Sequence, residues 1–178
     1  MALIKSIAGN EVCDQTARNT ANNIKVGGRN LLLKTGTPYS VTGNNSSNQC
    51  VVPYSIAKPV SELSGKSVCM SCHVSYSGSS TSGQFRFQGN GPSWVDITGI
   101  GAINISDIGN GLDLFGTRVI NTKDTNIQIR IDDVSGTLTF SNMKYELGNK
   151  ATDWTPAPED CQIKMIDDGA GNVTIKTL

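Results

Sequence analysis

Two stretches of the chain alternate strictly between apolar and polar residues, which is the pattern of half-buried β-strands. The apolar set is Phe85 and Phe87 in the first stretch, and Ile127, Ile129 and Ile131 in the second. We expect these side chains in the core. The residues between them are therefore predicted to face solvent: Gln84, Arg86, Gln88, Gln128, Arg130 and Asp132.

Short runs of the same kind, bounded by turn-forming Gly, Asn, Asp, Ser and Pro, recur along the middle of the chain. They predict eight strands, over residues 30–34, 49–53, 67–77, 83–88, 94–99, 111–115, 126–132 and 137–147. No helical period separates them. Short strands at roughly regular spacing favour two packed antiparallel sheets, so the sequence predicts an all-β sandwich over residues 27–158.

The two ends of the chain fall outside this pattern. Residues 1–26 predict a short strand followed by a helix capped by Asp14, whose apolar stripe is too thin for a stable isolated helix. We therefore expect an attachment or oligomerisation segment there. Residues 159–178 predict a β-hairpin. An isolated hairpin is marginal in water, so it is expected to pair with the N-terminal strand or with another subunit.

Composition narrows the class of protein. The 178 residues include 19 Gly, only 17% are charged, and 15 Lys and Arg balance 15 Asp and Glu. This balance suits short strands with polar turns and argues against a helical bundle. The absence of a basic stripe argues against a nucleic-acid partner. Neither a signal peptide nor a membrane span is recognisable, which predicts synthesis in a cytoplasm and no membrane partner.

The five cysteines are expected to be free thiols rather than a disulfide framework, since their number is odd and their spacing irregular. The run Cys69–His73 matches a haem-attachment pattern and half of a zinc site. However, residues three apart on a strand point to opposite faces, which predicts Cys72 in the core and Cys69 on the other face. No metal or other cofactor is expected. The Asp132-Asp133 pair lacks the ligand spacing of a calcium loop, so structural calcium is unsupported.

No catalytic constellation is recognisable. His73 is the only histidine and has no nucleophile in a recognisable motif. A glycosidase needs two convergent carboxyl groups, and nothing in the sequence brings two of the candidates together. These candidates are Asp96, Asp113, Asp132, Asp133 and Glu146.

Three motifs carry a resemblance to a known family. The run KYELGNKATDWTPAPED closes the sandwich region, Gly28-Arg29-Asn30-Leu31-Leu32-Leu33 opens it, and SELSGKSVCMSCHVSYS lies between them. Over residues 28–158 the chain resembles a carbohydrate-binding-like β-sandwich module of phage tail-fibre, baseplate and head-fibre proteins. The resemblance implies a jelly-roll fold and a non-enzymatic virion protein made in the host cytoplasm. It also implies a homo-oligomer, most often a trimer, attached to other virion proteins through residues 1–26.

If a host-surface glycan is bound, the expected contact surface combines an aromatic platform with planar polar side chains, because sugar faces stack on rings while amides and guanidinium groups bond hydroxyls. The candidates are Trp94, Arg86, Gln84, Gln88, Gln128 and Arg130, with His73, Tyr39 and Tyr54 as further ones. The competing interpretation is that these polar side chains are ordinary surface residues that bind no ligand, and that Trp94 is half-buried. Trp154, in the closing motif, is expected to pack against the sandwich.

Three functions follow in order of preference. The first is a virion structural subunit: a fibre, baseplate or head-decoration protein. The second is a dedicated glycan-binding adhesion module, and the third is a cell-wall polysaccharide hydrolase.

Overall fold

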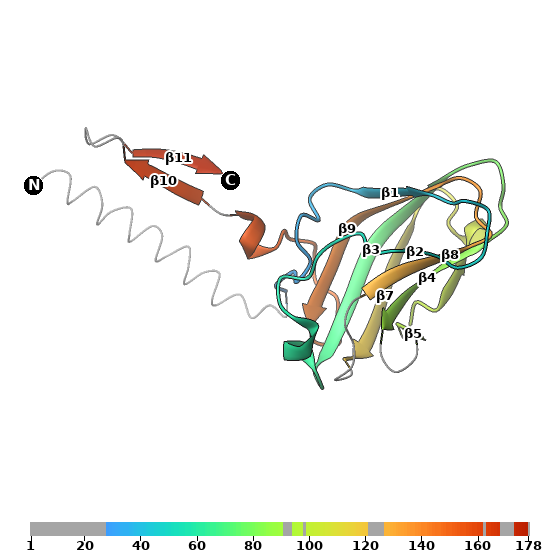
Figure 1. Ribbon diagram of the computed structural model, residues 1–178, viewed down its shortest axis with the longest axis horizontal. Coiled ribbons are helices and arrows are strands. Elements are labelled where there is room, and N and C mark those ends of the chain that lie inside the picture. Colours follow the sequence, from blue (N-terminus) through green and yellow to red (C-terminus); the bar gives the residue numbers. More distant parts are fainter. Residues whose placement is uncertain are drawn as a thin grey trace, which may run out of the picture.

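The computed structural model describes residues 28–90, 94–97, 99–120, 127–161, 163–167 and 173–177. The attachment segment predicted over residues 1–26 lies outside these ranges. Two antiparallel sheets pack face to face, and the strand arrows of Figure 1 show the two layers. The prediction of an all-β, jelly-roll β-sandwich is therefore confirmed.

Four strands form the first sheet, in the order β1 (Tyr39–Thr42), β9 (Thr137–Leu147), β3 (Ser67–Ser77) and β7 (Leu112–Val119). The second sheet has the order β2 (Gln49–Val51), β8 (Ile127–Asp132), β4 (Gln84–Asn90) and β5 (Trp94–Asp96), and β6 (Ala102–Asn104) also pairs with β4. Within the described residues, three short 3-10 helices connect the strands: η1 (Val60–Leu63), η2 (Ile105–Asp107) and η3 (Pro158–Cys161). Beyond η3, β10 (Ile163–Asp167) and β11 (Val173–Thr177) pair as an antiparallel hairpin.

The core lies between the sheets and is centred on three phenylalanines. Phe85 and Phe87 on β4 meet Phe140 on β9, with ring centroids 5.4 to 5.9 Å apart in edge-to-face geometry. Ile129 and Ile131 on β8 are fully buried beside them. Phe85, Phe87, Ile129 and Ile131 are thus in the core, as predicted, while Ile127 is only partly buried against it.

Most predicted strands are present, and the two longest agree with β3 and β9 to the residue. The strand predicted over residues 30–34 is wrong. This segment forms one isolated bridge, between Leu32 and Ile56, and then turns. Its apolar run buries Leu31 and Leu32 without sheet pairing. The sequence does not predict strands β1 and β6, because they are only four and three residues long.

Asn30 joins the opening and closing motifs of the sandwich. Its side chain is fully buried, and its Nδ2 donates to Thr35 Oγ1 at 2.9 Å and to the carbonyl oxygens of Met143 at 3.0 Å and Thr155 at 3.2 Å. Its Oδ1 accepts from the backbone N–H groups of Leu32 at 3.0 Å and Tyr145 at 3.2 Å. One amide therefore ties the entering chain to β9 and to the exiting chain.

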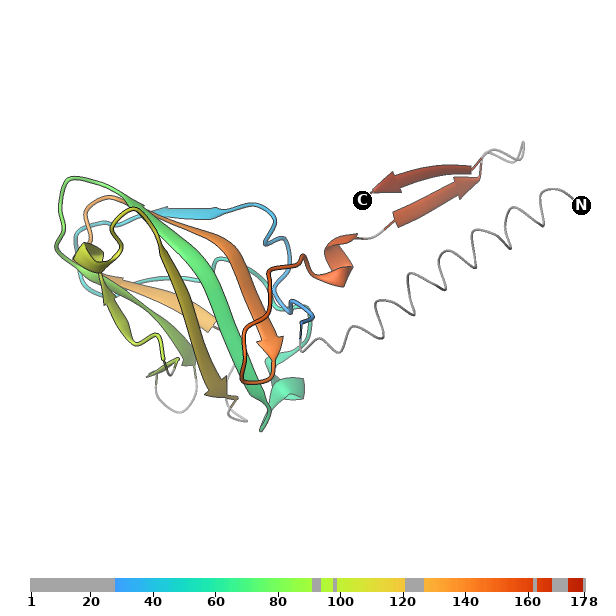
Figure 2. The same ribbon diagram turned by 180° about the vertical axis from the view of Figure 1, so that it is seen from behind.

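The closing segment, residues 148–157 between β9 and η3, folds back over the outer face of the four-stranded sheet. Figure 2 shows it turning back along β9 before η3. Beneath it lie Lys144 and Glu146, both fully buried and 3.6 Å apart. Lys144 Nζ donates to Thr152 Oγ1 at 2.7 Å and to the Asp153 carbonyl at 2.6 Å. These bonds compensate the cost of burying two charges.

This fold-back overturns one sequence prediction. Cys69, expected on an exposed face, pairs with Glu146 in the register and is fully buried. Burial, reinforced by the negative charge of Glu146, raises the Cys69 pKa to about 11. Cys72 lies in the core as expected, and burial raises its pKa to about 12. The alternation of β3 is correct, but both faces of the strand are covered at this end.

Candidate functional site

The five polar residues predicted as sugar contacts lie on one surface, the outer face of the five-stranded sheet. Gln84, Arg86 and Gln88 alternate with core phenylalanines along β4. The register sets Arg86 opposite Arg130 and Gln88 opposite Gln128 on β8, while Gln84 faces Asp132. Strand pairing therefore brings the five residues of two distant segments together, and we call this surface the polar face.

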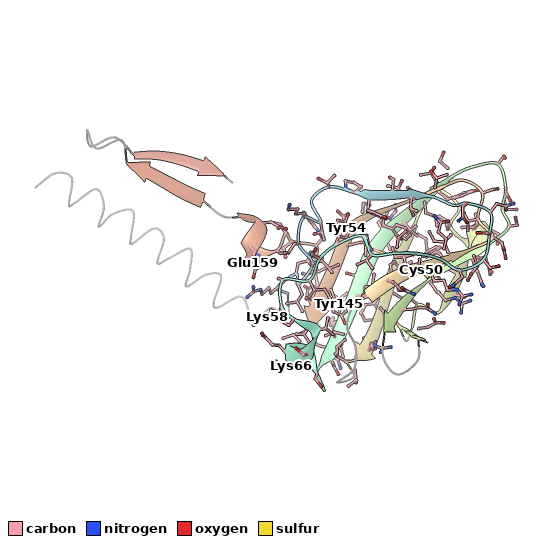
Figure 3. The ribbon with its side chains drawn as sticks, in the orientation of Figure 1. Cys50, Tyr54, Lys58, Lys66, Tyr145 and Glu159 are labelled. Atoms are coloured by element: carbon pink, nitrogen blue, oxygen red, sulfur yellow. The ribbon has the colours of Figure 1, made fainter. Side chains whose placement is uncertain are left out.

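A row of hydrogen bonds crosses four strands of the polar face. Gln88 Nε2 donates to Asp96 Oδ1 on β5 at 3.0 Å. Gln128 Nε2 lies 3.5 Å from Gln88 Oε1 and 3.3 Å from Cys50 Sγ on β2, which Figure 3 labels. Gln88 and Gln128 retain only 5% and 7% of their exposure. Both amides are therefore held by protein partners and fix the floor of the face. The prediction that Gln88, Gln128 and Asp132 face solvent is wrong, because each is buried among its neighbours on the sheet.

The guanidinium groups form the more accessible part of this face. Arg86 Nη1 lies 3.5 Å from Asp96 Oδ2, and Arg130 Nε lies 2.9 Å from Asp132 Oδ2. The two carboxylates balance two arginines that face each other across β4 and β8. Arg86 Nε is buried and has no hydrogen-bond partner among the described residues. A guanidinium presents five N–H donors in a fixed plane, so both arginines keep donors suited to ligand hydroxyls.

The aromatic candidates divide between several places. Trp94 begins β5 opposite Asn90, but its side chain lies outside the described part of the structure, so its stacking role stays a prediction. Tyr39 and Tyr54 form an edge-to-face pair with centroids 6.1 Å apart. Tyr54 Oη donates to the Thr37 carbonyl, and partial burial raises the Tyr54 pKa. This pair packs at the margin of the core rather than on the polar face.

Two other residues singled out in the sequence lie on the four-stranded sheet side of the molecule. Trp154 is half-buried, and its Nε1 donates to Thr35 Oγ1 at 3.2 Å, which confirms that it packs against the sandwich. His73 sits on β3, and its Nδ1 lies 2.7 Å from Asp113 Oδ1 on β7. His73 is therefore not part of the polar face.

The carboxylates considered for catalysis are mostly engaged in other contacts. Asp96 and Asp132 face arginines, and Glu146 is buried against Lys144. Among the described residues, no group of three His, Cys, Asp or Glu side chains is placed to hold a metal ion. Within the same part of the chain, no helix is long and apolar enough to cross a membrane.

The sequence missed Asp96 and Cys50 as partners within the polar face. The position of Asp96 could have been predicted, because it lies two residues after Trp94 and strand alternation therefore places it on the same face as the predicted contacts. The position of Cys50 could not, since its neighbour on β8 depends on a register between segments almost eighty residues apart.

Comparison with known proteins gives structural but not sequence matches. No model of a known protein family and no curated protein sequence matches the chain. Its fold is similar to the tripod (BppUct-A-L) from the baseplate of bacteriophage Tuc2009, with a TM-score of 0.51 and 17% identity over 74% of this chain. The match spans 59% of the tripod chain.

Carbohydrate-binding modules are more distant. The CBM22-1 xylan-binding domain of Paenibacillus barcinonensis Xyn10C has a TM-score of 0.43 and 10% identity, covering 63% of this chain and 72% of that domain. The C-terminal family 22 module of Clostridium thermocellum Xyn10B also has a TM-score of 0.43 and 10% identity, over 68% of this chain and 89% of that module. The fold of the described chain is thus a β-sandwich of the kind found in a phage baseplate protein.

Proposed function

We propose that this chain is a non-enzymatic structural subunit of a phage virion, in which the sandwich is a module carried by flanking assembly segments. The observation that carries the proposal is the similarity of fold to a domain of a baseplate tripod. The phage-type motifs of the sequence add to it, because Asn30 and Thr155 bring the opening and closing motifs into direct contact. Baseplate, tail-fibre and head-decoration positions are all compatible with the proposal.

Assembly is assigned to the ends of the chain. The hairpin β10–β11 stands apart from both sheets in Figure 1, and a two-stranded hairpin is marginal unless it packs on a partner. A homotrimer, built through residues 1–26 and this hairpin, supplies such a partner. The tripod fold match supports a three-fold arrangement. Sedimentation of the full chain and of a variant lacking residues 1–26 tests this: an oligomer should become a folded monomer, and an unchanged oligomer contradicts it.

A second role, adhesion to host-surface glycan, is favoured by the polar face. Arg86 and Arg130 present guanidinium donors on a floor of fixed amides, which is the chemistry that recognises sugar hydroxyls. The polysaccharide hydrolase is disfavoured, since Asp96 and Asp132 are neutralised by those arginines. Binding of the full chain to a glycan array, compared with an Arg130→Ala variant, tests the adhesive role. Loss of binding in the variant is expected. Equal binding by the two proteins would show that the polar face is not the glycan-binding surface.

A further inference from the structure

A groove lies on the outer face of the other sheet, where the closing segment meets β3, β7 and β9. Its volume is about 390 Å³. Residues 151–154 form one wall, and β3 and β7 contribute the floor. The side chains that carry the argument are Ser71, His73, Asp113, Phe115, Asn142 and Trp154.

Two aromatic side chains line this groove. Phe115 on the edge strand β7 keeps 45% of its surface exposed, although large apolar residues on β-strands normally face a core. The register places it opposite Ser71, on the outer side of the sheet. Trp154 stands in the wall formed by the closing segment, and its hydrogen bond to Thr35 fixes the indole. The groove therefore offers one exposed ring and one immobilised ring for stacking.

Polar groups between the rings are held in fixed positions. His73 is oriented by Asp113 at 2.7 Å, and its ring occupies the space beside Gly111, where an added Cβ would lie 2.7 Å from Nε2. Asp113 is 89% exposed, so its second oxygen remains available. Asn142 sits at the β-bulge of β9 with φ +51°, exposed and without a side-chain hydrogen bond to any other described residue.

The charge of the groove limits the ligand. Asp113 and Asp153 both line it, and no lysine or arginine among the described residues does. Carboxylates accept hydrogen bonds from hydroxyls but repel phosphate and carboxylate groups. This contrasts with the polar face, where two arginines are present.

We propose that this groove is a binding site for an uncharged saccharide, in which a sugar ring stacks on Phe115 while Asn142, Asp113 and His73 bond its hydroxyls. The proposal rests on the proposed contact with host glycan but not on the polar face. It predicts that neutral sugars bind and that glycans carrying phosphate or carboxylate groups do not.

The test compares binding of the full-length chain to neutral and to anionic oligosaccharides, with variants checked for native circular dichroism. Phe115→Ala and Asn142→Gly remove the ring and the amide, and glycine retains the positive φ of residue 142. Val119→Ala is the matched control, since Val119 is 61% exposed on the same strand but does not line the groove. Phe115→Ala and Asn142→Gly should each weaken neutral-sugar binding at least about tenfold, as for a central stacking contact. Val119→Ala should leave it unchanged.

Three results would contradict the proposal that the groove binds an uncharged saccharide. If both groove variants bind normally and only Arg130→Ala fails, glycan adhesion stands but occurs on the polar face. If only anionic glycans bind, the charge argument is wrong. If the wild-type chain binds no glycan, the groove and the adhesive role both fall, while the virion role is decided separately by labelling of particles.

Discussion

Replacing Asn30 by alanine should be among the most destabilising single changes in the sandwich. Asn30 is fully buried, and its side chain makes five hydrogen bonds to the entering chain, to β9 and to the exiting chain. Alanine removes both the donor and the acceptor atoms. The N–H groups of Leu32 and Tyr145 then lose this bond while both residues stay buried.

The magnitude follows from the groups that lose their partner. The N–H groups of Leu32 and Tyr145 both bond Asn30 Oδ1, and both residues are buried. A buried backbone donor left unsatisfied costs about 1–3 kcal/mol. Leaving both N–H groups unsatisfied should lower the free energy of unfolding by about 2–6 kcal/mol. This figure does not include the three acceptors that lose their bond from Asn30 Nδ2. A loss near 4 kcal/mol is large against the total stability of a domain.

Urea unfolding of the two proteins measures this loss. With m of about 2 kcal/mol/M, the midpoint should fall by about 2 M while m itself is unchanged. The matched control is Asn149→Ala, the same substitution at an exposed turn, which should stay within about 0.5 kcal/mol. A loss below about 1 kcal/mol for Asn30→Ala, or equal losses for the two variants, would refute the assignment of Asn30 as the joint between the motifs.

Further predictions concern the thiols and Trp94. Cys69→Ser and Cys72→Ser should each cost about 1–3 kcal/mol in urea unfolding, because each buries a hydroxyl; a neutral Cys69→Ser would contradict the burial of that face. Exposed Cys50 should react with a thiol reagent in the native protein, while Cys69 and Cys72 react only on unfolding. The raised pKa values of the Cys69 and Cys72 thiols also imply that these thiols deprotonate at lower pH in the unfolded chain than in the folded protein. Stability should therefore fall as the pH rises from about 9 toward 11 and 12. A melting temperature that stays constant over this pH range would exclude the linkage. Trp94→Ala should weaken any glycan binding by about 1–3 kcal/mol with little change in melting temperature, and a large fall would mark a core residue.

The sequence predicts the long strands because their signals are local. Residues of β3 and β9 are rich in apolar and β-branched side chains, and Gly65 and Gly148, both at positive φ, stand just outside them. The run after Asn30 is misleading because three consecutive leucines resemble a strand. Leu31 and Leu32 are instead buried just before a turn that the buried Asn30 amide holds in place. Local pattern cannot distinguish these two ways of burying leucine.

The candidate sites also differ in whether local sequence signals can predict them. Alternation along β4 and β8 predicts which residues share a face, and the register then unites them as the polar face. The burial of Cys69 and the groove beside Phe115 both depend on the closing segment folding back over the sheet. That path is set by contacts such as Lys144 to Asp153, which no periodicity encodes.

Electron microscopy of purified particles, with this chain labelled at its C-terminus, tests the central proposal most directly. The account predicts a label at a fixed, symmetric position on the virion, with occupancy that falls when residues 1–26 are removed. Particles that carry no label, from cells in which the labelled chain is made and folded, would contradict a structural role in the virion.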